Sequence, residues 1–63
     1  MKDYLFALTE YSENEGEYIF CEETSLDAAW ECLLGNYGFR KEELRYVDEY
    51  EPWEAEILGY DTY

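Results

Sequence analysis

Two segments near the N-terminus alternate large apolar side chains between two faces, which is the pattern of a half-buried strand. In KDYLFALTEYS, one face carries Tyr4, Phe6 and Leu8, and the other carries Leu5, Ala7, Thr9 and Tyr11. In EYIFCEE, Tyr18 and Phe20 share one face, and Ile19 and Cys21 share the other. The polar segment SENEG lies between them, with Asn14 and Gly16 at positions that suit a turn. We therefore predict a β-hairpin.

The spacing of apolar residues becomes helical after the second strand. Apolar side chains recur at intervals of three and four, at Leu26, Ala29, Trp30, Leu33 and Leu34. The sequence TSLD offers Thr24 or Ser25 as the N-cap and an acid near the positive end of the helix. Gly35 follows the last apolar position, so we predict that this main amphipathic helix ends there and packs on the hairpin.

The segment FRKEELRYVDEY, residues 39–50, fits two patterns. RKEEL suits the start of a helix, whereas ELRYVDEY alternates as a strand, with Leu44, Tyr46 and Tyr50 on one side and Val47 on the other. We favour a third strand over residues 43–50. Pro52 then suits a first helical position, and Gly59 follows the short helical segment WEAEIL.

The predicted order of elements is β-β-α-β-α. It indicates an α+β fold in which a small antiparallel sheet, the hairpin plus a third strand, carries the main helix and a short C-terminal helix. A chain of 63 residues forms one domain and buries only about 60% of its unfolded surface. Eight Tyr, three Phe and two Trp favour a folded chain despite a mean hydropathy of −0.64. The aromatic residues expected in the core are Tyr4, Phe6, Phe20, Trp30 and Trp53.

Several features bear on the cellular setting. Two cysteines, Cys21 and Cys32, are too few for a secreted disulfide scaffold. No apolar run follows Met1 and Lys2, so we expect no signal peptide, and no run is long enough to span a bilayer. Anionic lipid headgroups repel an acidic surface. We expect a cytoplasmic protein with free thiols and no membrane contact, in the host cytoplasm if viral, as a monomer or homodimer.

Known catalytic signatures are missing from the sequence. There is no histidine, no glycine-rich phosphate loop, no nucleophile elbow and no calcium-loop pattern. A chain this short also has little cleft for a carboxylate-pair hydrolase. We therefore expect no enzyme, no metal and no cofactor. The four basic residues form no basic patch, so we also expect no direct contact with nucleic acid.

Acidic residues are the strongest remaining signal. The chain has 17 Asp and Glu against four Lys and Arg, and its net charge of −13 exceeds the magnitude of about 2–8 that solubility requires. The acids fall in three clusters along the chain. The first, around the hairpin turn, contains Glu10, Glu13, Glu15 and Glu17, and the second contains Glu22, Glu23, Asp27 and Glu31. The third, in the C-terminal part, contains Asp48, Glu49, Glu51, Glu54, Glu56 and Asp61.

The density of this charge is comparable with that of nucleic acid. A compact chain of this length has a radius of gyration of about 11 Å and a width of roughly 25–30 Å. Thirteen charges match roughly 22 Å of duplex DNA. If the hairpin is extended, Glu13, Glu15 and Glu17 would also form a row with a spacing of about 6.5–7 Å.

In size, charge and Tyr and Trp content, the whole chain resembles the DNA-mimic inhibitors made by viruses and mobile elements, the anti-CRISPR and antirestriction proteins. The resemblance implies an inhibitor that occupies the nucleic-acid groove of a basic nucleic-acid-binding protein or defence complex. The alternative is a small acidic adaptor or regulator that binds another protein without competing with nucleic acid. Excess duplex or guide RNA should displace a mimic and leave an adaptor bound.

We expect the C-terminal cluster to bind the partner, because it is dense and no basic residue follows Arg45. Helical spacing would let Glu54 face solvent while Trp53 anchors the segment. Tyr11, Tyr50, Tyr60 and Tyr63 lie beside acids and would add contact area, unless the tail simply packs on the sheet. The predicted partner-binding residues are Asp48, Glu49, Tyr50, Glu51, Glu54 and Glu56, with Glu13, Glu15, Glu17, Asp27 and Glu31.

Overall fold

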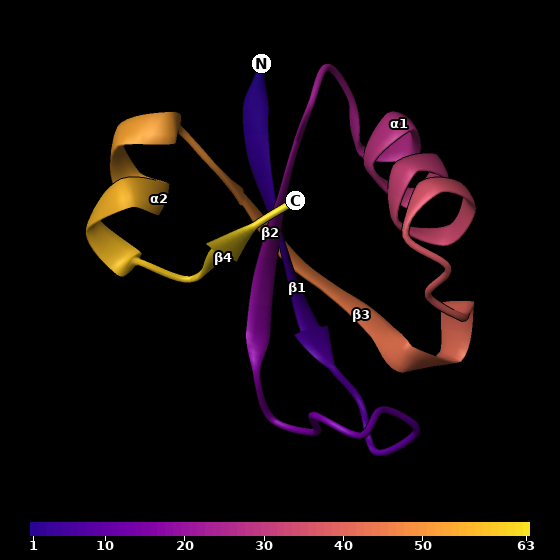
Figure 1. The fold of residues 1–63 in the computed structure, drawn as a ribbon. Coiled ribbons are helices and arrows are strands. Elements are labelled where there is room, and N and C mark those ends of the chain that lie inside the picture. The colour runs from indigo at the N-terminus through magenta and orange to yellow at the C-terminus, as the bar shows by residue number, and fades with distance from the viewer.

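A four-stranded sheet separates two helices (Figure 1). The computed structural model describes residues 1–63. The strands, in the spatial order β3-β1-β2-β4, are β1 (Lys2–Leu8), β2 (Tyr18–Glu23), β3 (Leu44–Tyr50) and β4 (Asp61–Thr62). The α-helices are α1 (Leu26–Glu31) and α2 (Pro52–Leu58), on opposite sides of the sheet. The α+β prediction is confirmed, and neither helix has the length and apolar content needed to cross a membrane.

The predicted hairpin is formed by β1 and β2, which pair antiparallel. Phe6 lies opposite Ile19 and Leu5 opposite Phe20, so the predicted faces are confirmed. Both strands are shorter than predicted, because residues 9–17 form a loop of turns. Arg40 Nη2 donates a hydrogen bond of 3.0 Å to the Tyr11 carbonyl in this loop. The hairpin acids therefore do not form the extended row that strand geometry would give.

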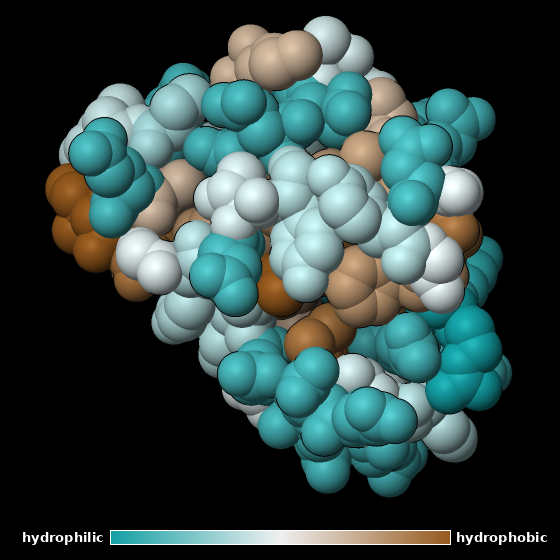
Figure 2. Space-filling view, viewed as in Figure 1, coloured by the Kyte–Doolittle hydropathy of each residue, from teal (hydrophilic) through white to brown (hydrophobic).

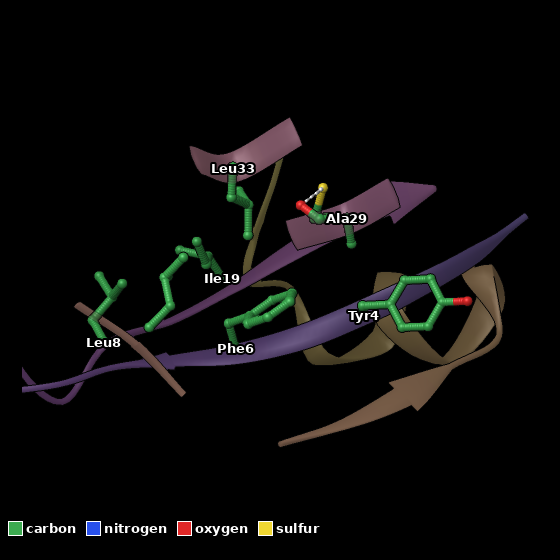
Figure 3. Packing of buried hydrophobic residues seen from close by; sticks show 8 residues of the cluster. Tyr4, Phe6, Leu8, Ile19, Ala29 and Leu33 are labelled. Atoms are coloured by element: carbon green, nitrogen blue, oxygen red, sulfur yellow. Dashed lines mark hydrogen bonds between the residues drawn. The ribbon is translucent and has the colours of Figure 1, made fainter. Parts of the chain in front are cut away.

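The main core lies between the sheet and α1. Phe6 and Ile19 project from the strands toward Ala29 and Leu33 of the following helical segment (Figure 3). Phe6, Ala29 and Leu33 have no exposed surface, so the predicted apolar stripe is confirmed. The Trp30 ring meets Phe6 edge to face, with ring centroids 4.9 Å apart. Ser25 is the N-cap, and its Oγ accepts a hydrogen bond of 3.1 Å from the Ala28 amide.

The main helix extends beyond its predicted end. After α1 the chain continues into a π-helical segment (Cys32–Asn36), in which the Tyr37 amide donates to the Cys32 carbonyl at 3.3 Å. Gly35 lies inside this segment and has no positive φ, so it does not end the helix. Gly38, with a φ of 75°, supplies the left-handed turn that follows.

β3 confirms the preferred interpretation of residues 43–50 and contains a bulge. A short 3₁₀ turn (Lys41–Glu43) precedes the strand. Tyr46 lies opposite Phe6, but Asp48 lies opposite Leu5, which leaves Val47 as an extra residue. The bulge moves Tyr50 to the α2 face of the sheet. The prediction that Tyr46 and Tyr50 share a face is therefore wrong.

α2 begins and ends where predicted, but it turns the opposite face toward the sheet. Pro52 occupies its first turn, and Gly59 caps its C-terminus with a φ of 75°. Ala55 is the buried residue and joins a small second core with Leu5 and Phe20. Trp53 is 64% exposed, so its predicted place in the core is wrong. A small inward-facing residue lets the helix lie close to the sheet and leaves its larger apolar side chains outside.

The C-terminal tail adds a strand that the sequence pattern did not predict. β4 pairs parallel with β2, so the sheet is mixed and not purely antiparallel. The Tyr63 amide donates to the Phe20 carbonyl at 2.7 Å, and the Glu22 amide donates to the Tyr63 carbonyl at 3.1 Å. The Tyr63 ring also packs against Tyr37, with centroids 4.9 Å apart. The end of the tail thus joins the edge of the sheet, and Tyr60 and Tyr63 stay partly exposed there.

Candidate protein-binding surface

The sheet brings acids from three strands together at the N-terminal end of β1. Glu22 lies opposite Asp3, Glu23 opposite Lys2, and Glu49 opposite Tyr4. Neighbouring strands are about 4.8 Å apart, so carboxylates distant in sequence share one end of the sheet. We call this group the strand-end cluster; it contains Asp3, Glu22, Glu23, Asp48, Glu49 and Glu51.

Half of the strand-end cluster was among the predicted binding residues, and half was missed. Asp48, Glu49 and Glu51 were predicted, and the structure leaves all three exposed. Glu22 and Glu23 were assigned to a different cluster because they precede α1 in the chain. The signal for their true position is the hairpin register, which sets the end of β2 beside the start of β1.

Lys2 partly neutralises the strand-end cluster. Its Nζ lies 3.1 Å from Glu51 Oε1 and 3.8 Å from Glu49 Oε2. The hydrogen bond from Lys2 to Glu51 and the charges of both carboxylates raise the pKa of Lys2. No basic residue follows Arg45, but the fold brings Lys2 from the N-terminus to two of the C-terminal acids. Because these side chains are about half exposed, the pairs add little stability.

Asp3 is the one buried acid of the strand-end cluster. Its exposed fraction is 4%, and its Oδ1 atom has no hydrogen-bond partner. Burial raises the pKa of Asp3, the charge of Glu22 raises it further, and the N-terminal amino group lowers it. An ionised Asp3 is thus unfavourable in the folded state.

The outer side of α2 carries exposed apolar side chains beside this cluster. We call Tyr50, Trp53, Ile57 and Leu58 the α2 patch; with Glu54 they line a shallow hollow. Ile57 is 76% exposed and Leu58 45% exposed. Figure 2 shows hydrophobic atoms at the left edge of the molecule, where Figure 1 places α2. Exposed apolar patches bordered by polar residues are typical of interaction sites.

Glu54 and Trp53 have exchanged the roles predicted for them. Glu54 is half-buried, and its Oε1 accepts a hydrogen bond of 3.2 Å from the Glu51 amide. Glu51 and Glu54 thus form a capping box at the start of α2. Tyr50 packs its ring against Phe20, with centroids 5.8 Å apart, and Glu56 is exposed.

The remaining predicted residues lie elsewhere. Glu13, Glu15 and Glu17 are exposed in the hairpin loop, at the bottom of Figure 1, away from the N-terminus at the top. Asp27 and Glu31 are exposed on α1, on the opposite side of the sheet from α2. The structure therefore does not join all predicted residues into one surface.

Few of the acids are balanced by a basic neighbour. Ion pairs involve only Lys2 and Arg40 as cations. Their partners are Glu49 and Glu51 at the strand end and Glu42 and Glu43 beside the 3₁₀ turn. No group of three or more Cys, Asp and Glu side chains is arranged to hold a metal ion.

Comparisons with protein families, curated proteins and solved structures found no match to this chain. The features of this chain that bear on function are those of its surface. That surface combines unpaired carboxylates with one apolar patch, and both are suited to binding another macromolecule.

Proposed function

We propose that this protein is a non-enzymatic acidic inhibitor that binds the basic nucleic-acid-binding groove of another protein by mimicking nucleic acid. The single observation that supports this most is the unpaired charge. The net charge is −13, and ion pairs occupy only four of the 17 acids. Repulsion between so many like charges opposes folding. A basic partner would relieve this repulsion, and the relief would favour binding.

The dimensions of the molecule fit this proposal. The longest extent is 29 Å and the radius of gyration is 10.7 Å. A duplex of roughly 22 Å carries as many negative charges as the net negative charge of this protein. The protein can therefore offer a phosphate-like charge density over a length of less than one turn of duplex, which is about 34 Å. Its proposed class is that of the anti-CRISPR and antirestriction inhibitors that it resembles.

A displacement assay tests the proposal. The partner is captured from a host lysate, identified by mass spectrometry and purified with its own nucleic acid. The protein should release a labelled duplex or guide RNA from that partner, and excess nucleic acid should release the protein in turn. If both bind together without affecting one another, mimicry is wrong.

The adaptor alternative is favoured by one specific observation, the α2 patch. Nucleic acid offers phosphates and bases, and a pure charge mimic has no need of exposed Trp53 and Ile57. An adaptor would bind a protein surface that carries no nucleic acid. In the displacement assay, an adaptor would stay bound to its partner at every concentration of competing nucleic acid.

A further inference from the structure

Three members of the α2 patch, Trp53, Ile57 and Leu58, lie outside the core although they are large apolar residues. Ala55 faces the sheet, and Trp53 and Ile57 are each two positions away, about 160° around the helix. Helical periodicity therefore sets both side chains on the outermost line of α2. Nothing in the fold covers them: Trp53 is 64% exposed and Ile57 is 76% exposed.

Acids flank this apolar line on the surface. Glu56 follows Ala55 on one flank of α2, and Glu54 lines the hollow on the other. Glu51 precedes the helix and is exposed, although it is paired with Lys2. An occupant of the hollow must therefore combine an apolar side chain with positive charge on both sides of it.

We propose that the α2 patch binds an amphipathic segment of a basic protein, in which one large apolar side chain enters the hollow between flanking Lys or Arg residues. The proposal rests on the proposed function, because it assigns part of the contact with the basic partner to α2. It adds that the partner contributes an apolar side chain that nucleic acid lacks. Charge would then guide the encounter, and the apolar contact would slow dissociation.

A second copy of this chain is a poorer occupant. Each copy carries a net charge of −13, so two patches in contact would bring the flanking glutamates of both copies together. A stable interface also buries about 800 Å² per partner, roughly a fifth of this chain's 4203 Å² surface. The patch alone is smaller than that, whereas a basic partner can extend the contact over the neighbouring acids.

Two synthetic peptides provide the probe. The first is an amphipathic Lys and Leu peptide with Leu at helical spacing, and the second has the same lysines with Ser in place of every Leu. Binding is followed by the backbone amide signals in ¹H–¹⁵N spectra, and the indole N–H signals of Trp30 and Trp53, assigned with Trp53→Phe, show where the peptide binds. The variants Trp53→Ala and Ile57→Ala each remove one large apolar side chain of the α2 patch, and Ala keeps a high helix propensity at that position. Tyr11→Ala, at an exposed aromatic of the hairpin loop, is the matched control.

The Leu peptide should shift the Trp53 signal and leave the Trp30 signal in place. Each patch variant should weaken its binding roughly tenfold or more, and Tyr11→Ala should not. Equal binding of both peptides, unaffected by the patch variants, would overturn this inference and leave the charge-based function standing. Self-association that Ile57→Ala abolishes would also overturn it, because a second copy would then be the occupant. Binding of neither peptide would count against the proposed function itself.

Discussion

The rings of Phe6 and Trp30 meet edge to face with centroids 4.9 Å apart, and this contact joins the central strand β1 to α1. Phe6 has no exposed surface, whereas Trp30 is partly exposed at the edge of the main core. The other tryptophan, Trp53, contacts solvent over most of its surface. The two tryptophans thus separate a structural role from a surface role within one short chain.

Truncating the two tryptophans should have unequal effects on stability. Trp30→Ala should lower the free energy of unfolding by about 3 kcal/mol, because it removes a ring from the main core. Trp53→Ala should change it by less than about 0.5 kcal/mol. Urea unfolding followed by circular dichroism measures both. Since a domain of this size is stable by only roughly 3–9 kcal/mol, Trp30→Phe provides a milder second variant. Equal losses for the two Ala variants would contradict the assignment of the core.

The buried carboxylate of Asp3 should make stability depend on pH. Burial and Glu22 raise its folded pKa above the ordinary value of 3.8, so protonation favours the folded state. This contribution is fully present below pH 3.8 and is lost as the pH rises through the folded pKa. Asp3→Asn, which stays neutral, should therefore be more stable than the wild type at pH 7, by about 1 kcal/mol.

The measurement for Asp3 is the difference in melting temperature between Asp3→Asn and wild type, from pH 7 to pH 4. The difference should shrink as the wild-type carboxyl becomes protonated. Glu22→Gln, in a chain that keeps Asp3, is the control. It removes one cause of the raised pKa of Asp3, so the melting temperature should depend less on pH than in the wild type. A constant difference over this range would show that Asp3 is not the group responsible.

The two cysteines should differ in reactivity. Cys21 has no exposed surface, and burial, with the neighbouring Cys32, raises the pKa of its thiol to about 12. A protonated, buried thiol is a poor nucleophile. Iodoacetamide at pH 8 should label Cys32 in the folded protein and label Cys21 only after unfolding. In Cys32→Ser the folded protein should take up no label, and labelling of Cys21 at the rate of a free thiol would refute its placement in the core.

Much of the fold could be predicted because local patterns and packing agree there. The Leu26–Leu34 stripe, the Ser25 cap and the Pro52 and Gly59 boundaries all follow from side chains acting on their own segment. The inward face of α2 could not be predicted, because Trp53 and Ile57 have the spacing of a buried helical stripe and Ala55 lies on the opposite face. In the folded chain the small Ala55 packs on Leu5 and Phe20.

The candidate surface was predictable only in part, for a related reason. The acids of β3 were recognised from their density, but the bulge at Val47 that turns Tyr50 toward Phe20 has no clear mark in an alternating pattern. The ion pair between Lys2 and Glu51 joins residues from opposite ends of the chain. Such contacts depend on strand register, which a single sequence does not specify when both faces of a strand are apolar.

Association with the partner should depend steeply on salt. Between about 50 and 500 mM salt the association rate constant should fall strongly, because screening removes the attraction that guides the encounter. The dissociation rate constant should change less if the α2 patch holds the complex. Surface plasmon resonance measures both rates. An association rate that is flat over this range would contradict electrostatic guidance.

Carboxylates at defined positions, and not the total charge, should bind the partner. Three variants test this, each removing three charges. They are Asp48→Asn/Glu49→Gln/Glu56→Gln, Glu13→Gln/Glu15→Gln/Glu17→Gln and Glu10→Gln/Asp27→Asn/Glu31→Gln, the last two at exposed acids outside the strand-end cluster. Glu51 and Glu54 are left intact because they cap α2. Circular dichroism confirms that each variant is folded.

The decisive measurement is the affinity of these three variants for the captured partner at one salt concentration. The variant at Asp48, Glu49 and Glu56 should lose affinity by 2 kcal/mol or more, roughly thirtyfold, since it removes carboxylates that become paired on binding. The other two should lose far less. Equal, small losses in all three variants would mean that the acids act as a diffuse field, and wild-type affinity of the first variant would show that the binding surface lies elsewhere.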